Sequence, residues 1–318
     1  MKKIKLKNID LGPLLIESGE IIVDKFTIIK GSLFKSEILE LIHSLVEFEH
    51  EILKIYKEEK LSVVSLNKTG KLRRLLYKKV PGMASCHLRC DESFISFESD
   101  LVSFIILKEK EVVVSSILPE DEIPYEGINV FFPLNRFNSL DFLSIKFNKS
   151  KEDPNSYFMY KDEYWPYTTS FKKLMVSIIE ELLSLVPTSR KPGSPASIPV
   201  YHTNEFVVSA DMRGFFLGIR TLAHHELPSE IKYSLPIYLV INRRLADTVV
   251  DSIFIDLPEQ GMDENTSYRF FYENFIDGTN PETSVIFSSN STKLITEVSK
   301  LNNSSVIDID KFQYQIRL

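Results

Sequence analysis

The sequence is poor in several features, and each shortage excludes a class of protein. Only two of the 318 residues are cysteine, which excludes a disulfide-built scaffold and suits a reducing compartment, so we expect a cytoplasmic protein. The formal net charge is −6, so the chain as a whole carries no nucleic-acid signature. No run approaches about 18 uncharged apolar residues, and residues 1–12 lack the apolar segment of a signal peptide. We therefore expect neither a membrane span nor a secretory leader.

The remaining composition is that of an ordinary globular protein. Hydrophobic residues make up 43% of the chain and charged residues 26%, so its 318 residues can form one large domain or two modest ones. Apolar runs of strand length alternate with segments in which apolar residues recur at helical spacing. This alternation predicts an α/β fold.

A phosphate-binding loop is expected where a strand, a glycine and a helix follow one another. Residues 25–29 form an apolar strand pattern, Gly31 follows, and helical spacing begins near Ser36. Such a loop wraps backbone N–H groups around phosphate and supplies a lysine and a Ser or Thr, here Lys35 and Ser36. The loop is, however, roughly two residues shorter than the usual motif, and bulky side chains at 33–34 replace the second glycine. We expect it to enclose a triphosphate poorly.

The stretch 251–295 has the layout of a phosphate-handling site. An apolar strand pattern at 253–255 ends in Asp256, and a second one at 284–287 ends in a polar run, Ser-Ser-Asn-Ser. A helical pattern at 266–275 lies between them. Because the carboxyl ends of parallel strands meet at one edge of a sheet, the polar ends of both strands should lie together there.

These motifs resemble those of the ABC-type ATPase heads of the SMC, RecF and OLD kind. In that family a Walker B strand ends in an aspartate and a catalytic glutamate, a Gly-Leu-Asp D-loop follows, and the next strand ends in a switch histidine. The matching positions here are Asp256, residues 261–263 and residues 289–291. Leu257 stands where the glutamate belongs and Asn290 where the histidine belongs. The order of the motifs is kept while the catalytic residues are replaced.

The resemblance extends over both lobes of such a head. It implies an α/β fold: an ABC-ATPase-like head with a mixed, mainly parallel sheet flanked by helices, plus an antiparallel β subdomain. Alternating apolar patterns at 84–116 suit that subdomain. Residues 208–213 take the place of the signature that opens a helix and holds a γ-phosphate, with Ser209 kept and Asp211 replacing its glycine. A carboxylate there repels phosphate, so this signature should bind ATP poorly.

The domain organisation follows from the resemblance and from one connector. Residues 187–199 are rich in proline and contain Pro-Gly-Ser-Pro, which marks a boundary. We predict an N-terminal lobe at 1–145 with the degenerate phosphate loop and the antiparallel subdomain. A helical insertion and linker follow at 146–198, and the C-terminal lobe at 199–318 carries the signature, Walker B and D-loop positions.

The implied function is that of a catalytically degenerate head. It would act as a structural or regulatory partner in a bacterial complex, in anti-phage defence or DNA maintenance, paired with itself as a homodimer or with an active ATPase or effector subunit. No cofactor is expected; a weak ATPase with an unorthodox loop, binding ATP and Mg²⁺ weakly, is the alternative. The residues of the degenerate nucleotide site are Gly31, Lys35, Ser36, Ser209, Asp256, Glu259 and Asp263.

A basic cluster offers a third interpretation. Lysine and arginine are concentrated at 71–79, in the run KLRRLLYKK. They could contact the phosphates of nucleic acid, or they could be the solvated side of an amphipathic helix that buries its leucines, which is the commoner arrangement. The basic residues are Lys71, Arg73, Arg74, Lys78 and Lys79.

Two cysteines flank a histidine, but their spacing does not suit a metal. Cys86, His87 and Cys90 lack CxxC spacing, and the chain offers no second pair of ligands. On a strand both cysteines share one face and the histidine the other. We expect two core cysteines and no metal site.

Overall fold

The computed structural model describes residues 1–134, apart from breaks at 13, 61, 69, 80–85, 89 and 124–126. It further describes residues 178 and 181, residues 198–241 with breaks at 203–206, 212–213, 218–219 and 223–227, and residues 248–316. Two compact units emerge from the packing. The first contains residues 1–130, 250–257 and 280–318, and the second contains residues 131–249 and 258–279. These units do not follow the predicted linear lobes, because strands from both ends of the chain share the first one.

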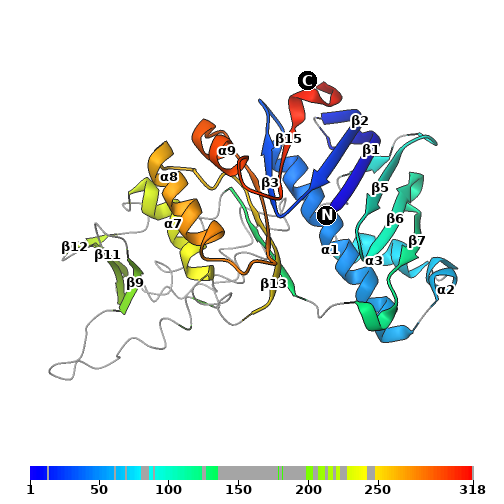
Figure 1. The fold of residues 1–318 in the computed structure, drawn as a ribbon, viewed down its shortest axis with the longest axis horizontal. Helices are drawn as coiled ribbons and strands as arrows, with labels where there is room; N and C mark the ends of the chain where they lie inside the picture. The colour runs from blue at the N-terminus through cyan, green and yellow to red at the C-terminus, as the bar shows by residue number, and fades with distance from the viewer. Residues whose placement is uncertain are drawn as a thin grey trace, which may run out of the picture. The chain divides into compact units, whose positions relative to one another are not determined.

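A mainly parallel sheet of five strands forms one half of the first unit (Figure 1). Its order is β15-β3-β14-β13-β8, and the first four strands are joined by parallel pairing. Residues such as Ile28, Phe254 and Ile286 are fully buried, because both faces of a parallel sheet are covered and its strands read as continuous apolar runs. The strands span Phe26–Lys30 (β3), Ile128–Phe132 (β8), Val250–Ile255 (β13), Ser284–Ser288 (β14) and Ser304–Asp308 (β15).

A seven-stranded antiparallel sheet forms the other half of the first unit. Its order is β16-β2-β1-β5-β6-β7, with the short β4 also paired to β1. Buried and more exposed residues alternate along β5 and β6, as expected for a sheet with one face on a core. The strands span Lys2–Asp10 (β1), Leu14–Val23 (β2), His87–Leu88 (β4), Phe94–Glu98 (β5), Val102–Leu107 (β6), Val112–Ile117 (β7) and Gln313–Ile316 (β16). The predicted α/β class and antiparallel subdomain are confirmed.

Helix α1, Lys35–Glu59, contacts both sheets. Toward the antiparallel sheet, the Phe48 ring meets Phe104 edge-on with 5.2 Å between centroids. Toward the parallel sheet, the ring of His43 meets Phe254 at 4.7 Å. The carboxylate of Glu49 is fully buried, where it pairs with Lys2 of β1 and accepts a hydrogen bond from Ser99 Oγ at 2.5 Å. The helix predicted from residue 36 is therefore the element against which both sheets of this unit pack.

The described part of the second unit contains an antiparallel sheet and the helices α7 and α8. The sheet has four strands in the order β12-β11-β10-β9. No described helix of the chain is long and apolar enough to cross a membrane. The elements of the second unit span Ile198–His202 (β9), Val207–Asp211 (β10), Gly214–Leu217 (β11), Arg220–Leu222 (β12), Ser229–Val240 (α7), Glu264–Phe271 (α8) and the π-helical turn Tyr272–Ile276.

The cysteine prediction was half wrong. Cys86 is buried at 1% exposure, but Cys90 is exposed and accepts a hydrogen bond from Asn8 Nδ2 at 3.5 Å. The reason is that β4 ends at Leu88, so Cys90 lies in the turn before β5 and does not share the face of Cys86. The predicted helical insertion and linker at 146–198 falls almost wholly outside the described residues.

Phe48→Ala should destabilise the first unit strongly. The substitution removes a fully buried ring at the contact of α1 with the antiparallel sheet, and such a change costs about 3–5 kcal/mol. Urea unfolding followed by circular dichroism measures it. Val64→Ala, at a side chain 62% exposed on α2 (Val63–Lys68), is the control and should stay within about 0.5 kcal/mol. Equal effects of the two substitutions would contradict this account of the core.

Candidate functional site

The loops that follow β3, β13 and β14 lie at one edge of the parallel sheet. All three strands run in the same direction, so their carboxyl ends fall together. This brings the loop from Gly31 to Ser36, which leads into α1, beside Asp256 and Ser288. Ligands of open α/β sheets bind outside such strand ends. The structure therefore joins three segments that the sequence had marked separately.

Asp256 is the centre of this edge. Its side chain is buried, at 3% exposure, directly after β13. Its Oδ1 atom accepts hydrogen bonds from Ser36 Oγ at 3.0 Å and from Ser288 Oγ at 2.6 Å. Ser288 Oγ in turn accepts the N–H of Leu257 at 2.9 Å. The site residues Ser36 and Asp256 are thus in direct contact. Ser288, the first residue of the predicted polar run but not one of the predicted site residues, joins them.

The loop from Gly31 to Ser36 closes on itself. Lys35 is buried at 8% exposure, and its ammonium group donates to the carbonyl of Gly31 at 2.6 Å. Phe34 takes a left-handed conformation, with φ of 61°, as the residue before α1, and Leu33 is 49% exposed. A non-glycine residue with positive φ is strained, which is a consequence of the missing glycine. The lysine that would reach a phosphate instead spans the short loop.

The carboxylate of Asp310 contacts the same loop at Ser32. Asp310 follows β15 in the 3₁₀ turn η8, Ile309–Lys311. Its carboxylate accepts the backbone N–H of Ser32 at 3.1 and 3.2 Å and the Ser32 hydroxyl at 2.8 Å. Sequence reasoning missed this contact, since Asp310 and Ser32 are 278 residues apart. Only the parallel pairing of β15 with β3 brings them together.

The charge of Asp256 affects the pKa values of two glutamates of α1. Burial, and then the charges of Asp256 and Glu37, raise the pKa of Glu40 to about 8. Burial also raises the pKa of Glu37, with Asp256 contributing. Both lie within about one turn of Ser36, so their helical spacing was the available signal. No group of three or more His, Cys, Asp or Glu side chains is arranged to hold a metal ion among the residues that the structure describes.

The polar run after β14 is used for backbone contacts. Ser289 N donates to the carbonyl of Ile29 at 3.0 Å, and its Oγ accepts the N–H of Ser291 at 3.0 Å. Ser291 Oγ then caps helix α9, Thr292–Val298, by accepting the N–H of Leu294 at 3.2 Å. Asn290, in the position of the switch histidine, is exposed. These serines therefore have local structural partners.

The D-loop positions belong to the second unit. Asp263 is the N-cap of α8, where it accepts the N–H groups of Asn265 and Thr266 at 2.9 and 3.1 Å. Its hydrogen bonds with Thr266, followed by that with Asn265 N, lower the pKa of this carboxyl. Gly261 has φ of 80°, and a Cβ there would lie 2.5 Å from the Tyr233 ring. Glu259 belongs to this unit as well. Helix capping accounts for Asp263 without a ligand.

Ser209 is not at the start of a helix, as its place in the signature had implied. It lies within β10, where its backbone is paired with Phe216 of β11 and Pro199 of β9. The segment is rich in β-branched and aromatic residues, which favour strands, and this local preference prevails over the position in the motif order. Ser209 and the strand ends around Asp256 lie in different units.

The basic cluster forms the amphipathic helix α3, Lys71–Lys79. Leu72 and Leu76 are buried, at 2% and 0% exposure. Arg73 and Arg74 are exposed, and Lys71 pairs with Glu59 at the end of α1. The side chains of Lys78 and Lys79 lie outside the described residues. Helix α3 therefore packs through its leucines and exposes its arginines to solvent, as an amphipathic surface helix does.

Comparisons with known proteins give remote likenesses only. No family model matches the sequence, and no curated protein matches it. Among solved structures, the chain is similar to a nucleotide-free ATP-binding cassette of an ABC transporter (13% identity, 100% of this chain and 92% of that one, TM-score 0.36). It is also similar to the SMC head domain from Thermotoga maritima (9%, 92% and 90%, 0.37) and to an SmcHead bound to the C-winged helix domain of ScpA (11%, 92% and 90%, 0.41). Likenesses of this size carry no argument about function.

Glu40→Gln should change how stability depends on pH. Because the folded pKa of Glu40 is raised, the folded chain keeps this proton where the unfolded chain has lost it, and stability falls as the pH rises from 4.5 to about 8. Glutamine cannot lose a proton, so the variant should match wild type near pH 5 and exceed it by roughly 1–3 kcal/mol at pH 8.

Urea unfolding at both pH values measures this difference. Glu58→Gln, at an exposed position of the same helix, is the matched control. A gain from Glu40→Gln of the same size at pH 5 and pH 8 would show that ionisation of Glu40 is not its cause.

Proposed function

We propose that this chain is a catalytically degenerate head of the ABC type that serves as a structural or regulatory subunit. One observation carries the proposal. The Lys35 ammonium, which in a working phosphate loop binds the nucleotide, is engaged with Gly31 across a loop that is too short to enclose a triphosphate. The Gly31 carbonyl thus engages the lysine that a phosphate would require.

Hydrolysis of ATP needs groups that this chain has replaced. Ser36 and Asp256 suit a magnesium ion, because a hydroxyl and a carboxylate are ligands that this ion accepts. The phosphate cradle does not fit, since Leu33 and Phe34 stand where glycine-rich backbone is required. Leu257, with φ of 46°, cannot activate water in place of a glutamate. The residues present therefore support neither triphosphate binding nor a hydrolytic step.

The role that remains is association with another protein. Heads that resemble this one pair face to face, so we infer a partner that is either a second copy of the chain or an active ATPase or effector subunit. The setting that we propose is a bacterial complex, in anti-phage defence or DNA maintenance. The exposed arginines of α3 offer a site for nucleic acid, but the burial of the leucines on that helix explains α3 without one.

Titration calorimetry with Mg·ATP tests the proposal. We expect no binding heat at millimolar ATP for wild type, and the same result for Asp256→Ala. Micromolar binding by wild type that Asp256→Ala abolishes would overturn the proposal and favour a weak ATPase. That result would mean that the loop binds phosphate although it is short.

A loop-restoring variant is the positive control. Phe34→Gly combined with two residues inserted after Ser32 recreates the usual spacing between Gly31 and Lys35. Because Ser36 and Asp256 already meet, this variant should bind Mg·ATP measurably if loop length is the obstacle.

A further inference from the structure

Asp310 occupies the phosphate loop as an anion from within the chain. Strand β15 runs parallel to β3 with Asp308 beside Lys30, so the next residues pass along the start of the loop. There the Asp310 carboxylate takes both the N–H and the hydroxyl of Ser32, at distances of 2.8–3.2 Å. Backbone N–H groups before a helix are the groups with which such loops bind phosphate. Here a carboxylate binds the first of them.

The fit between the two segments is close. Gly31 has φ of 150°, and a Cβ at this position would lie 3.1 Å from Ile309 Cβ and 3.4 Å from Asp310 Oδ1. Glycine is therefore required where η8 approaches the loop. In a phosphate loop, glycine allows the backbone to approach the ligand. In this chain Gly31 allows the approach of Asp310.

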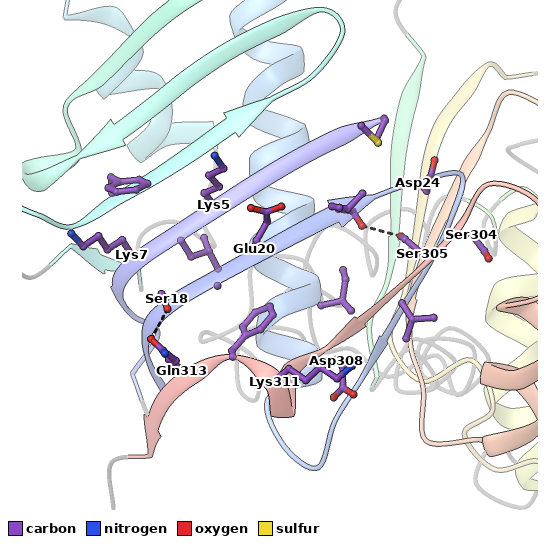
Figure 2. Close-up of a pocket in the computed structure, with 18 residues that line it drawn as sticks. Lys5, Lys7, Ser18, Glu20, Asp24, Ser304, Ser305, Asp308, Lys311 and Gln313 are labelled. Carbon is purple, nitrogen blue, oxygen red and sulfur yellow. Dashed lines mark hydrogen bonds between the residues drawn. The ribbon is translucent and has the colours of Figure 1, made fainter.

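The segment that carries Asp310 is fastened on both sides. Before it, Ser305 Oγ donates to the carbonyl of Ile22 at 2.9 Å. After it, Ser18 Oγ donates to Gln313 Oε1 at 2.8 Å, and both contacts reach β2 (Figure 2). The Lys30–Asp308 ion pair, at 3.2 Å, adds a third attachment. The segment is thus attached by contacts that do not involve the Asp310 side chain.

Open space lies beside this segment. A surface hollow of about 990 Å³ adjoins it, lined in part by Asp308, Lys311 and Phe312 (Figure 2). The Asp310 side chain is itself exposed, so its withdrawal from Ser32 would uncover no buried core. The hydrogen bonds from Ser32, followed by the charges of Lys35 and Lys30, lower the pKa of Asp310. At neutral pH the group on the loop is a carboxylate.

We propose that Asp310 is an autoinhibitory latch, an internal substitute for phosphate whose withdrawal frees the loop to bind a phosphate-sized oxyanion. The inference rests on the proposed function, since it treats the loop as a former phosphate site. It goes further by assigning the block at Ser32 to one side chain, whereas the short loop excludes only a full triphosphate. A phosphate cannot reach Ser32 N while Asp310 holds it, and the two negative charges repel each other.

Binding of inorganic pyrophosphate, measured by calorimetry, tests the latch. Wild type, Asp310→Ala and Asp308→Ala are compared. The matched control Asp308→Ala removes a carboxylate two residues away that pairs with Lys30 and leaves Ser32 untouched. Asp310→Ala should bind at least about tenfold more tightly than wild type, the size expected when a hydrogen-bonded charged competitor is removed. Asp308→Ala should bind like wild type.

A second variant guards against loss of structure. Asp310→Asn keeps an acceptor oxygen for Ser32 but removes the charge, so it should also bind pyrophosphate more tightly than wild type, though less so than Asp310→Ala. Thermal melting of each variant reports whether it is folded. Failure of both folded variants to exceed wild type would overturn the latch and leave Asp310 as a structural contact.

The latch and the proposed function fail in different measurements. Micromolar binding of Mg·ATP by wild type would sink the degenerate head, whatever the variants do. Pyrophosphate binding that is equal in wild type, Asp308→Ala and Asp310→Ala would sink the latch, whatever wild type does with ATP.

Discussion

Burial of one helix between two sheets is the constraint on which the first unit depends. Phe48 of α1 packs against the antiparallel sheet and His43 against the parallel sheet, while the buried charge of Glu49 requires Lys2 and Ser99 as partners. Because α1 begins at the end of the loop, these contacts fix where the loop ends. The other end of the loop is fixed by β3 in the parallel sheet. Packing far from the site therefore sets the span that the loop must cover, and six residues from Gly31 to Ser36 cover it.

This constraint gives the central residues of the site a structural role. Asp256 is buried, and a buried carboxylate is costly unless it accepts hydrogen bonds. Ser36 and Ser288 supply them, and the contact joins the first turn of α1 to the ends of β13 and β14. Replacing either serine with alanine would remove one of the two hydrogen bonds to Asp256 Oδ1, at the junction of α1, β13 and β14. Ser36 and Asp256 thus have a structural role that does not depend on a nucleotide.

Sequence reasoning reached the parts of the fold that local patterns determine. Continuous apolar runs predicted β3, β13 and β14, and the rule that parallel strand ends meet placed the polar ends of β13 and β14 together, where Ser288 donates to Asp256. It missed Asp310, because that contact depends on which strand lies beside β3, and β15 is separated from β3 by most of the chain. It misplaced Ser209 because motif order was preferred to the strand propensity of the surrounding residues. It did not predict the raised pKa of Glu40, because that shift follows mainly from the burial of the side chain.

The two unusual features of the loop have one electrostatic explanation. The N–H groups before a helix carry partial positive charge whether or not a ligand is present. An active phosphate loop leaves them open to solvent and to the nucleotide, and glycine keeps the space clear. In this chain Leu33 and Phe34 stand where that glycine would be. Asp310 compensates the charge on the side of Ser32, and Lys35 satisfies the carbonyl of Gly31. The two contacts therefore have complementary charges: an anion accepts the N–H of Ser32, and a cation donates to the carbonyl of Gly31.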